Sequence, residues 1–138
     1  MILLDTNVVS AIMQPKPDPA VLEWLRHQVP TSLYLSSVTI AEILFGLRIL
    51  PEGQRRQRLE DQFARFLARG FEQRILPFDE PAARMYAELM GRRRQRGRPM
   101  SLPDGQIAAI ARTHHCAIAT RNLRDFDECG LEVVNPFA

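Results

Sequence analysis

The stretch MILLDTN, residues 1–7, decides the fold that we predict for this chain. Residues 2–4 form a short apolar run that ends abruptly in polar residues, and apolar residues at helical spacing resume at Val8. Such a run, closed by polar residues and followed by a helix, is typical of a buried strand in a parallel sheet. Ligands bind at the carboxyl ends of such strands. We therefore expect the carboxylate of Asp5 to face a ligand crevice, although Asp5 also suits a cap for a helix that begins at Thr6.

The composition predicts one cytoplasmic domain over residues 1–138. This length and a hydrophobic content of 46% are enough for a single core. A formal net charge of +2 is too small to establish nucleic-acid binding. Cys116 and Cys129 lack the spacing of a zinc site, so two free thiols are expected. We find no signal-peptide pattern and no apolar run long enough to cross a membrane, which favours a reduced, cytoplasmic protein with no membrane contact.

Short apolar runs alternate with helical patterns along the rest of the chain. The segments expected to form strands are residues 2–4, 33–35, 74–78, 117–119 and 132–134. Helical patterns occupy residues 38–50 and 52–69, follow Asp18 and Asp79, and resume at Asp104, with a short helical turn at residues 123–126. Strands that alternate with helices predict an α/β sandwich with a mainly parallel sheet.

Two further acids, Glu42 and Asp104, lie within or at the start of predicted helices. Glu42 interrupts a strongly apolar helix, so its carboxylate either reaches the surface or faces a polar pocket. Asp104 opens a helix of small and apolar residues. The pattern Ser101-x-x-Asp104 resembles a capping box, which explains Asp104 structurally, but the start of a helix is also where anionic groups collect.

The acids are expected to converge at one edge of the sheet. Asp5, Asp104 and the pair Asn122/Asp125 follow strand ends or open helices, and Glu42 can reach the same place. Clustered carboxylates repel one another unless a cation neutralises them. Oxygen ligands without histidine or thiolate favour Mg²⁺ or Mn²⁺ over zinc. A hard cation in such a cluster suits the hydrolysis of phosphodiester bonds.

The run RRRQRGR at residues 92–98 has two interpretations, which the sequence leaves open. Cations at the end of a helix complement its dipole, so the run can be a solvated helix end. Alternatively, it is a patch that contacts phosphates or an acidic partner.

An ordered set of motifs resembles the PIN domain, and most closely the VapC-type toxins of toxin–antitoxin pairs. The set comprises MILLDTN at 1–7, SVTIAE at 37–42, Pro103-Asp104 before an Ile/Ala helix, and TRN at 120–122 before Asp125-Phe126. It covers nearly the whole chain. The resemblance implies a PIN-like three-layer sandwich: a mainly parallel sheet of four to five strands with helices on both faces.

The resemblance also implies an activity and partners. It implies a Mg²⁺-dependent endoribonuclease, with Mn²⁺ as a possible substitute, that acts on RNA. A small antitoxin protein, whose tail occupies the acidic groove, would inhibit it. A homodimer, or a hetero-oligomer with the antitoxin, is the family expectation.

Residue roles carry over by position. Asp5 and Asp104 would be the metal ligands, and Glu42 would orient or deprotonate the attacking water. The last acidic position of the family is open: either Asp125 fills it or the cluster has three firm acids, and the number of metal ions is open too. The expected contacts to substrate or to the waters of the metal come from four polar residues: Thr6, Asn7, Thr120 and Asn122.

Other functions fit the sequence less well. Phosphoryl-accepting receivers and haloacid-dehalogenase-type phosphatases also place an Asp after the first strand. The phosphatases need a second Asp where this chain has Asn7, and both families need a late lysine, whereas Lys16 is the only lysine. A catalytically silent module that binds RNA or a protein partner on the same fold remains the alternative.

Overall fold

The first apolar run forms the central strand of a five-stranded parallel sheet. A computed structural model describes residues 1–138 and gives the strand order β3-β2-β1-β4-β5. Every neighbouring pair of strands is parallel. The strands are β1 (Ile2–Leu4), β2 (Leu33–Ser36), β3 (Ile75–Leu76), β4 (Ala117–Ala119) and β5 (Val133–Val134). The predicted mainly parallel sheet is confirmed, with five strands.

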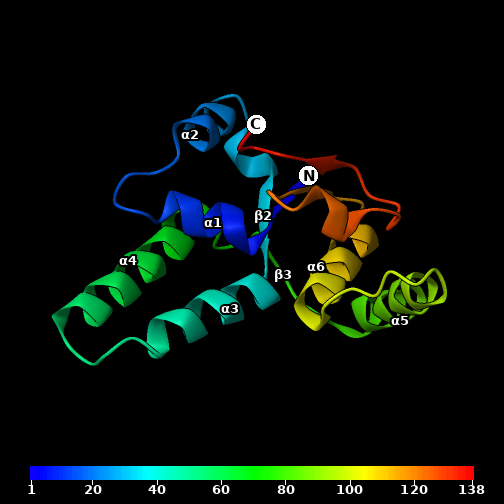
Figure 1. Cartoon of the computed structure of the whole chain (residues 1–138). Helices are drawn as coiled ribbons and strands as arrows, with labels where there is room; N and C mark the ends of the chain where they lie inside the picture. The colour runs from blue at the N-terminus through cyan, green and yellow to red at the C-terminus, as the bar shows by residue number, and fades with distance from the viewer.

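Six α-helices cover the two faces of this sheet (Figure 1). They are α1 (Thr6–Ile12), α2 (Pro19–Arg26), α3 (Ser37–Arg48), α4 (Gln54–Gly70), α5 (Glu80–Gln95) and α6 (Leu102–Thr113). Single 3-10 turns lie at η1 (Pro30–Ser32) and η2 (Leu123–Phe126). In Figure 1, α1, α2 and α4 lie on one side of β1 and β2, and α5 and α6 lie on the other. None of the helices combines the length and apolar character needed to cross a membrane.

Alternation along the central strands builds two cores. Leu3 of β1 and Ile118 of β4 face a core that α5 and α6 complete. Their neighbours Leu4 and Ala119 face the opposite core, which includes Phe63 of α4. Successive side chains of a strand point to opposite faces, so one pair of strands serves both cores. Leu3, Leu4 and Ile118 are fully buried, and each contributes about 2 kcal/mol of transfer free energy. The structure is therefore a three-layer sandwich, as predicted.

A close approach of two helices fixes the start of α6. A Cβ atom added at Gly105 would lie 2.5 Å from Sδ of Met90 and 3.0 Å from a ring carbon of Tyr86. Both of these residues belong to α5. Glycine therefore lets α6 pack directly against α5 at the point where Asp104 enters the helix.

Most of the arginine run at residues 92–98 has a structural role. The side chain of Arg93 is 4% exposed and donates hydrogen bonds to the carbonyls of Arg98, Asp125 and Asp127. Arg96 pairs with Glu128 at 2.9 Å, and Arg98 pairs with both Asp127 and Glu128. Through these hydrogen bonds and ion pairs, the three arginines connect the end of α5 to residues 125–128. The structure thus shows a third role for part of this run, and a contact of Arg92 and Arg94 with an anionic partner stays a prediction.

Candidate active site

Asp5 lies at the carboxyl end of β1, where its carboxylate is held by three donors. Its Oδ1 accepts a hydrogen bond from the backbone N–H of Thr6 at 2.8 Å. Its Oδ2 accepts one from the hydroxyl of Thr120 at 2.7 Å and one from the side-chain amide of Asn7 at 3.3 Å. The residue is only 4% exposed. Asp5 therefore caps α1 and also presents a rigid carboxylate at the edge of the sheet.

A chain of hydroxyl groups holds Glu42. The hydroxyl of Thr6 donates to Oε1 of Glu42 at 2.7 Å and lies 3.0 Å from the hydroxyl of Thr39. A hydroxyl has one proton, and that of Thr6 goes to Glu42, so Thr39 must donate to Thr6. Thr39 is fully buried, whereas Glu42 is exposed. The chain Thr39–Thr6–Glu42 thus orients a surface carboxylate from inside the core.

Asp104 enters the site on the first turn of α6. The hydroxyl of Ser101 caps this helix by accepting a hydrogen bond from the backbone N–H of Asp104 at 3.3 Å. The capping pattern read from the sequence is therefore present. Asp104 also lies close enough to Asp5 for its charge to raise the pKa of that carboxyl, so here too the structural and the functional interpretation describe the same residue.

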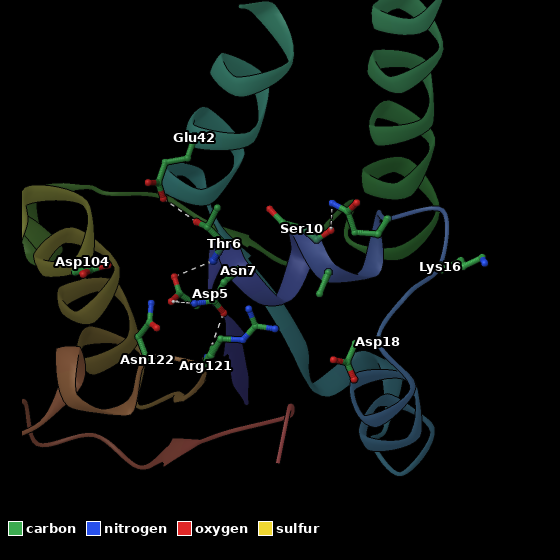
Figure 2. A pocket seen from close by; sticks show the side chains of 12 residues that line it. Asp5, Thr6, Asn7, Ser10, Lys16, Asp18, Glu42, Asp104, Arg121 and Asn122 are labelled. Carbon is green, nitrogen blue, oxygen red and sulfur yellow. Dashed lines mark hydrogen bonds between the residues drawn. The ribbon is translucent and has the colours of Figure 1, made fainter. Parts of the chain in front are cut away.

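A polar cavity of about 650 Å³ joins these three acids. Figure 2 shows the side chains of Glu42, Asp104 and Asn122 arranged around Asp5. All but one of the lining residues are polar or charged, and they are Asp5, Thr6, Asn7, Ser10, Ala11, Gln14, Lys16, Asp18, Glu42, Asp104, Arg121 and Asn122. The acids come from three places: Asp5 precedes α1, Glu42 lies within α3, and Asp104 lies in the first turn of α6. All three line one surface cavity.

Burial and mutual repulsion make it costly to ionise this cluster. Burial raises the pKa of Asp5 above its ordinary value, the charges of Asp104 and Glu42 raise it further, and hydrogen bonds from Thr120 and Thr6 oppose the rise. Burial likewise raises the pKa of Asp104, with added repulsion from Asp125 and Glu42 against the hydrogen bond with Ser101. A bound cation would relieve this repulsion and favour the ionised forms.

The donor set fits a hard divalent cation that keeps part of its water shell. All candidate ligands are oxygen atoms, which Mg²⁺ and Mn²⁺ prefer. No three side chains of His, Cys, Asp or Glu lie close enough together to enclose a metal ion by themselves. Mg²⁺ is commonly held by one or two carboxylates together with several waters, and such an open arrangement suits that mode of binding.

The eight residues that we selected from the sequence differ in whether they line the cavity. Six of them line the cavity: Asp5, Thr6, Asn7, Glu42, Asp104 and Asn122. Thr120 does not line it and is fully buried, with its hydroxyl donated to Asp5 and accepting from the N–H of Asn122. Because a fully buried hydroxyl cannot reach a substrate, we assign Thr120 a role in positioning Asp5, in place of the expected substrate contact.

Asp125 lies beside the site but outside the cavity lining. It is an exposed residue of η2, close enough to Asp104 to raise the pKa of that carboxyl. Asn122 lines the cavity, and its backbone N–H donates to the hydroxyl of Thr120 at 3.0 Å. Of the two candidates for the last polar position, Asn122 is therefore the one that faces the hollow.

Sequence reasoning missed the two basic residues of the cavity, Lys16 and Arg121. The guanidinium of Arg121 lies 3.9 Å from the ring centroid of Phe137, a cation–π distance that fixes its place at the rim. Its backbone N–H donates to the side chain of Asn7 at 3.2 Å. Arg121 stands inside the TRN motif, so the motif itself was the available signal. Its partner Phe137 is too far along the chain to have been linked to it.

The sequence of this chain is similar to those of known proteins. The family model for the PIN domain matches residues 2–130. The chain is 41% identical over 137 residues to "VapC ribonuclease Y4jK" of Sinorhizobium fredii, which covers 99% of this chain and 98% of the relative. It is 37% identical to "Toxin FitB" of Neisseria gonorrhoeae, over 99% of each chain.

A solved structure has the same fold over its whole length. The crystal structure of FitAcB from Neisseria gonorrhoeae contains a chain that superposes with a TM-score of 0.93 at 37% sequence identity. The match covers 99% of this chain and 99% of that chain. The likeness therefore extends over the sheet, both helical layers and the cavity edge.

Proposed function

The chain belongs to the PIN-domain family, within its VapC-type toxins, and we propose on this premise that it is a Mg²⁺-dependent endoribonuclease. The observation that carries the proposal is the convergence of Asp5, Glu42 and Asp104 on one polar cavity at the carboxyl edge of the sheet. Burial and the charges of neighbouring carboxylates raise the pKa values of Asp5 and Asp104, so these two groups are suited to share a divalent cation.

In this proposal Asp5 and Asp104 hold the metal ion. When bound, Mg²⁺ would lower the pKa of an attacking water and offset negative charge on the phosphate. The hydrogen bonds from Thr6, Asn7 and Thr120 keep the Asp5 carboxylate fixed toward the cavity. A preorganised ligand of this kind loses little freedom when the cation arrives.

Glu42 orients the attacking water and accepts its proton. Thr6 occupies Oε1 of Glu42, which leaves Oε2 to receive the proton. Asn7, Asn122 and Arg121 line the same cavity and are placed to bind the phosphate or the sugar. General base catalysis of this kind contributes about 10²- to 10⁴-fold to a rate, so Glu42→Gln should lose activity within that range.

A cleavage assay on RNA tests the proposal. We expect cleavage by the purified protein with Mg²⁺, none with EDTA, and none from Asp5→Asn or Asp104→Asn, because each variant removes a proposed metal ligand. Asp125→Asn is the matched control, since that carboxylate lies outside the cavity lining, and it should retain most of the activity. Thermal melting checks that every variant is folded.

Three outcomes of this assay would reject the proposal. They are cleavage that survives EDTA, equal cleavage by Asp5→Asn, and binding of RNA without any cleavage. The last result would identify the catalytically silent binding module that the sequence leaves as the alternative.

We also propose an antitoxin as the protein partner, because the family works in toxin–antitoxin pairs. Three large apolar side chains on or next to α3 support an assembly: Leu44, Phe45 and Ile49 are 43%, 67% and 67% exposed. Exposed apolar side chains grouped on one helix are typical of an interaction surface. Expression in growing cells should arrest growth, and co-expression of a cognate antitoxin should relieve the arrest and yield a co-purifying complex.

A further inference from the structure

A row of long polar side chains, four of them arginines, runs along one face of α4. The row, here called the α4 stripe, consists of Arg55, Arg58, Gln62, Arg65 and Arg69. Their spacing alternates between three and four residues, which keeps them on one side of an α-helix. All five side chains belong to exposed residues. From Arg55 to Arg69 the stripe extends about 21 Å at 1.5 Å per residue.

The charges of the α4 stripe have no acidic partner. Glu60, an acid of the same helix, is paired with Arg48 and Arg56, neither of which belongs to the stripe. Asp61, the other acid of α4, accepts a hydrogen bond from Gln57 at 3.0 Å. None of the four stripe arginines forms an ion pair within the chain, unlike Arg26 and Arg84, which are paired. Four uncompensated positive charges therefore stand in a row.

A continuous groove connects the α4 stripe to the acidic cavity. A second hollow of about 540 Å³ lies between α1, α3 and α4 and shares Thr6, Ser10, Gln14 and Glu42 with the acidic cavity. Its wall on α4 is formed by stripe residues Arg55, Arg58 and Gln62. A third hollow of about 430 Å³ continues past Met13 and Gln62 and contains Arg65 and Arg69. In Figure 1, α3 and α4 lie next to each other, and α1 lies above them in the view.

The negative charge of the acidic cavity explains why a polyanion would need a basic groove beside it. The acidic cavity has four carboxylates, from Asp5, Asp18, Glu42 and Asp104, against two cations, Lys16 and Arg121. Without a metal ion it repels a phosphodiester chain. A positive row along the adjoining hollows offsets this repulsion for the phosphates that flank the one being cleaved.

We propose that the α4 stripe binds the backbone of single-stranded RNA on one side of the scissile bond and leads it into the acidic cavity. The inference rests on the proposed nuclease function. Grooves that bind single strands combine a basic track for the phosphates with apolar surface for the bases. The second hollow supplies both, because Ile43, Leu47 and Leu59 line it together with Arg55 and Arg58.

A binding experiment tests the α4 stripe without cleavage. The probe is a labelled single-stranded RNA of about 12 nucleotides, within the site size of such grooves, and each variant carries Asp5→Asn. Arg58→Gln with Arg65→Gln should weaken binding and reduce the slope of log affinity against log salt by about 1.4, or 0.7 per lost phosphate contact. The matched control, Arg26→Gln with Arg84→Gln, removes the same charge from exposed arginines of α2 and α5 and should leave the slope unchanged.

Kinetics separate the stripe from the chemistry. In the catalytically intact chain, Arg58→Gln with Arg65→Gln should raise KM for the RNA and leave kcat unchanged. It should not slow the hydrolysis of bis(p-nitrophenyl) phosphate, which is small enough to occupy the acidic cavity alone. Thermal melting confirms that the double variant is folded.

The outcomes distinguish this inference from the proposed function. If the unmodified chain cleaves no RNA but the stripe variant still weakens RNA binding, the nuclease proposal fails and the stripe stands. If RNA is cleaved but neither KM nor the salt slope changes in the stripe variant, the stripe inference alone is overturned. It is also overturned if that variant binds RNA normally but loses the co-expressed antitoxin, because the stripe is then a protein interface.

Discussion

At the scale of single residues, Asp5 and Asp104 each serve the fold and the site at once. Asp5 caps α1, and Asp104 stands in the capping box that Ser101 opens. The sequence could not choose between cap and catalytic acid because both roles require the same place, a helix start at the edge of a sheet. The burial of Thr120 could not be read from its motif, because its backbone N–H donates to Val134, which lies outside that motif.

Thr39 provides a residue-scale prediction, since it acts on Glu42 only through Thr6. Thr39→Val removes the buried hydroxyl that donates to Thr6, so Glu42 should lose its fixed orientation. Outer partners of this kind are worth about 10- to 100-fold in activity. We expect kcat for RNA to fall in that range while KM changes little.

Thr39→Ser is the control, because it keeps the hydroxyl and should restore most of kcat. A serine variant as slow as the valine variant would mean that packing, and not the hydrogen bond, determines the effect.

At the scale of elements, the alternation of strands and helices was predictable, and the boundaries moved by a few residues. Ser36 shows why: it ends β2 and also caps α3 by accepting from the N–H of Thr39 at 3.0 Å. Arg93 shows what a local pattern misses. It looked like part of a charged run, yet its carbonyl partners Asp125 and Asp127 lie more than 30 residues further along. No helical periodicity contains that information. The outward direction of the arginines of α4, in contrast, follows from helical periodicity alone.

The contact between α5 and α6 gives a prediction at this scale. Gly105→Ala places a methyl group against Met90 and Tyr86, so it should destabilise the fold by about 1–3 kcal/mol through overpacking. Because the start of α6 carries Asp104, activity should fall as well. Chemical denaturation and the cleavage assay measure the two effects.

Gly91→Ala is the matched control on the partner helix. No atom lies within 4 Å of a Cβ added there, and alanine favours an exposed helix by about 1 kcal/mol. This variant should be more stable than the parent chain. Equal stabilisation by Gly105→Ala would show that the two helices do not meet as closely as described.

At the scale of the whole molecule, the acidic cavity lowers the stability of the metal-free protein. The pKa values of Asp5 and Asp104 are raised above the ordinary value of 3.8, so the folded chain holds protons there more tightly than the unfolded chain. By linkage, this contribution is most favourable at low pH, and it is lost as pH rises from the ordinary pKa through the raised folded-state pKa.

The pH dependence of Tm in EDTA therefore tests whether the folded state raises these two pKa values. At neutral pH, Asp5→Asn with Asp104→Asn should melt at a higher temperature than the parent chain, and the gap should close as pH falls through the raised pKa values. Adding Mg²⁺ should raise Tm for the parent chain alone, because only that chain retains the proposed ligands. A difference in Tm that does not depend on pH would show that folding does not raise the pKa values of these two carboxyls.

The central place of β1 has a consequence for how the protein comes into existence on the ribosome. Translation delivers β1 first, but its partner β4 and the hydroxyl of Thr120 emerge only near the end of synthesis. Phe137, which steadies Arg121, is the second residue from the end. Such long-range pairing makes assembly wait for nearly the complete polypeptide. The position of the Asp5 carboxylate therefore depends on segments that lie more than 100 residues apart, and a fragment without β4 would not hold it in place.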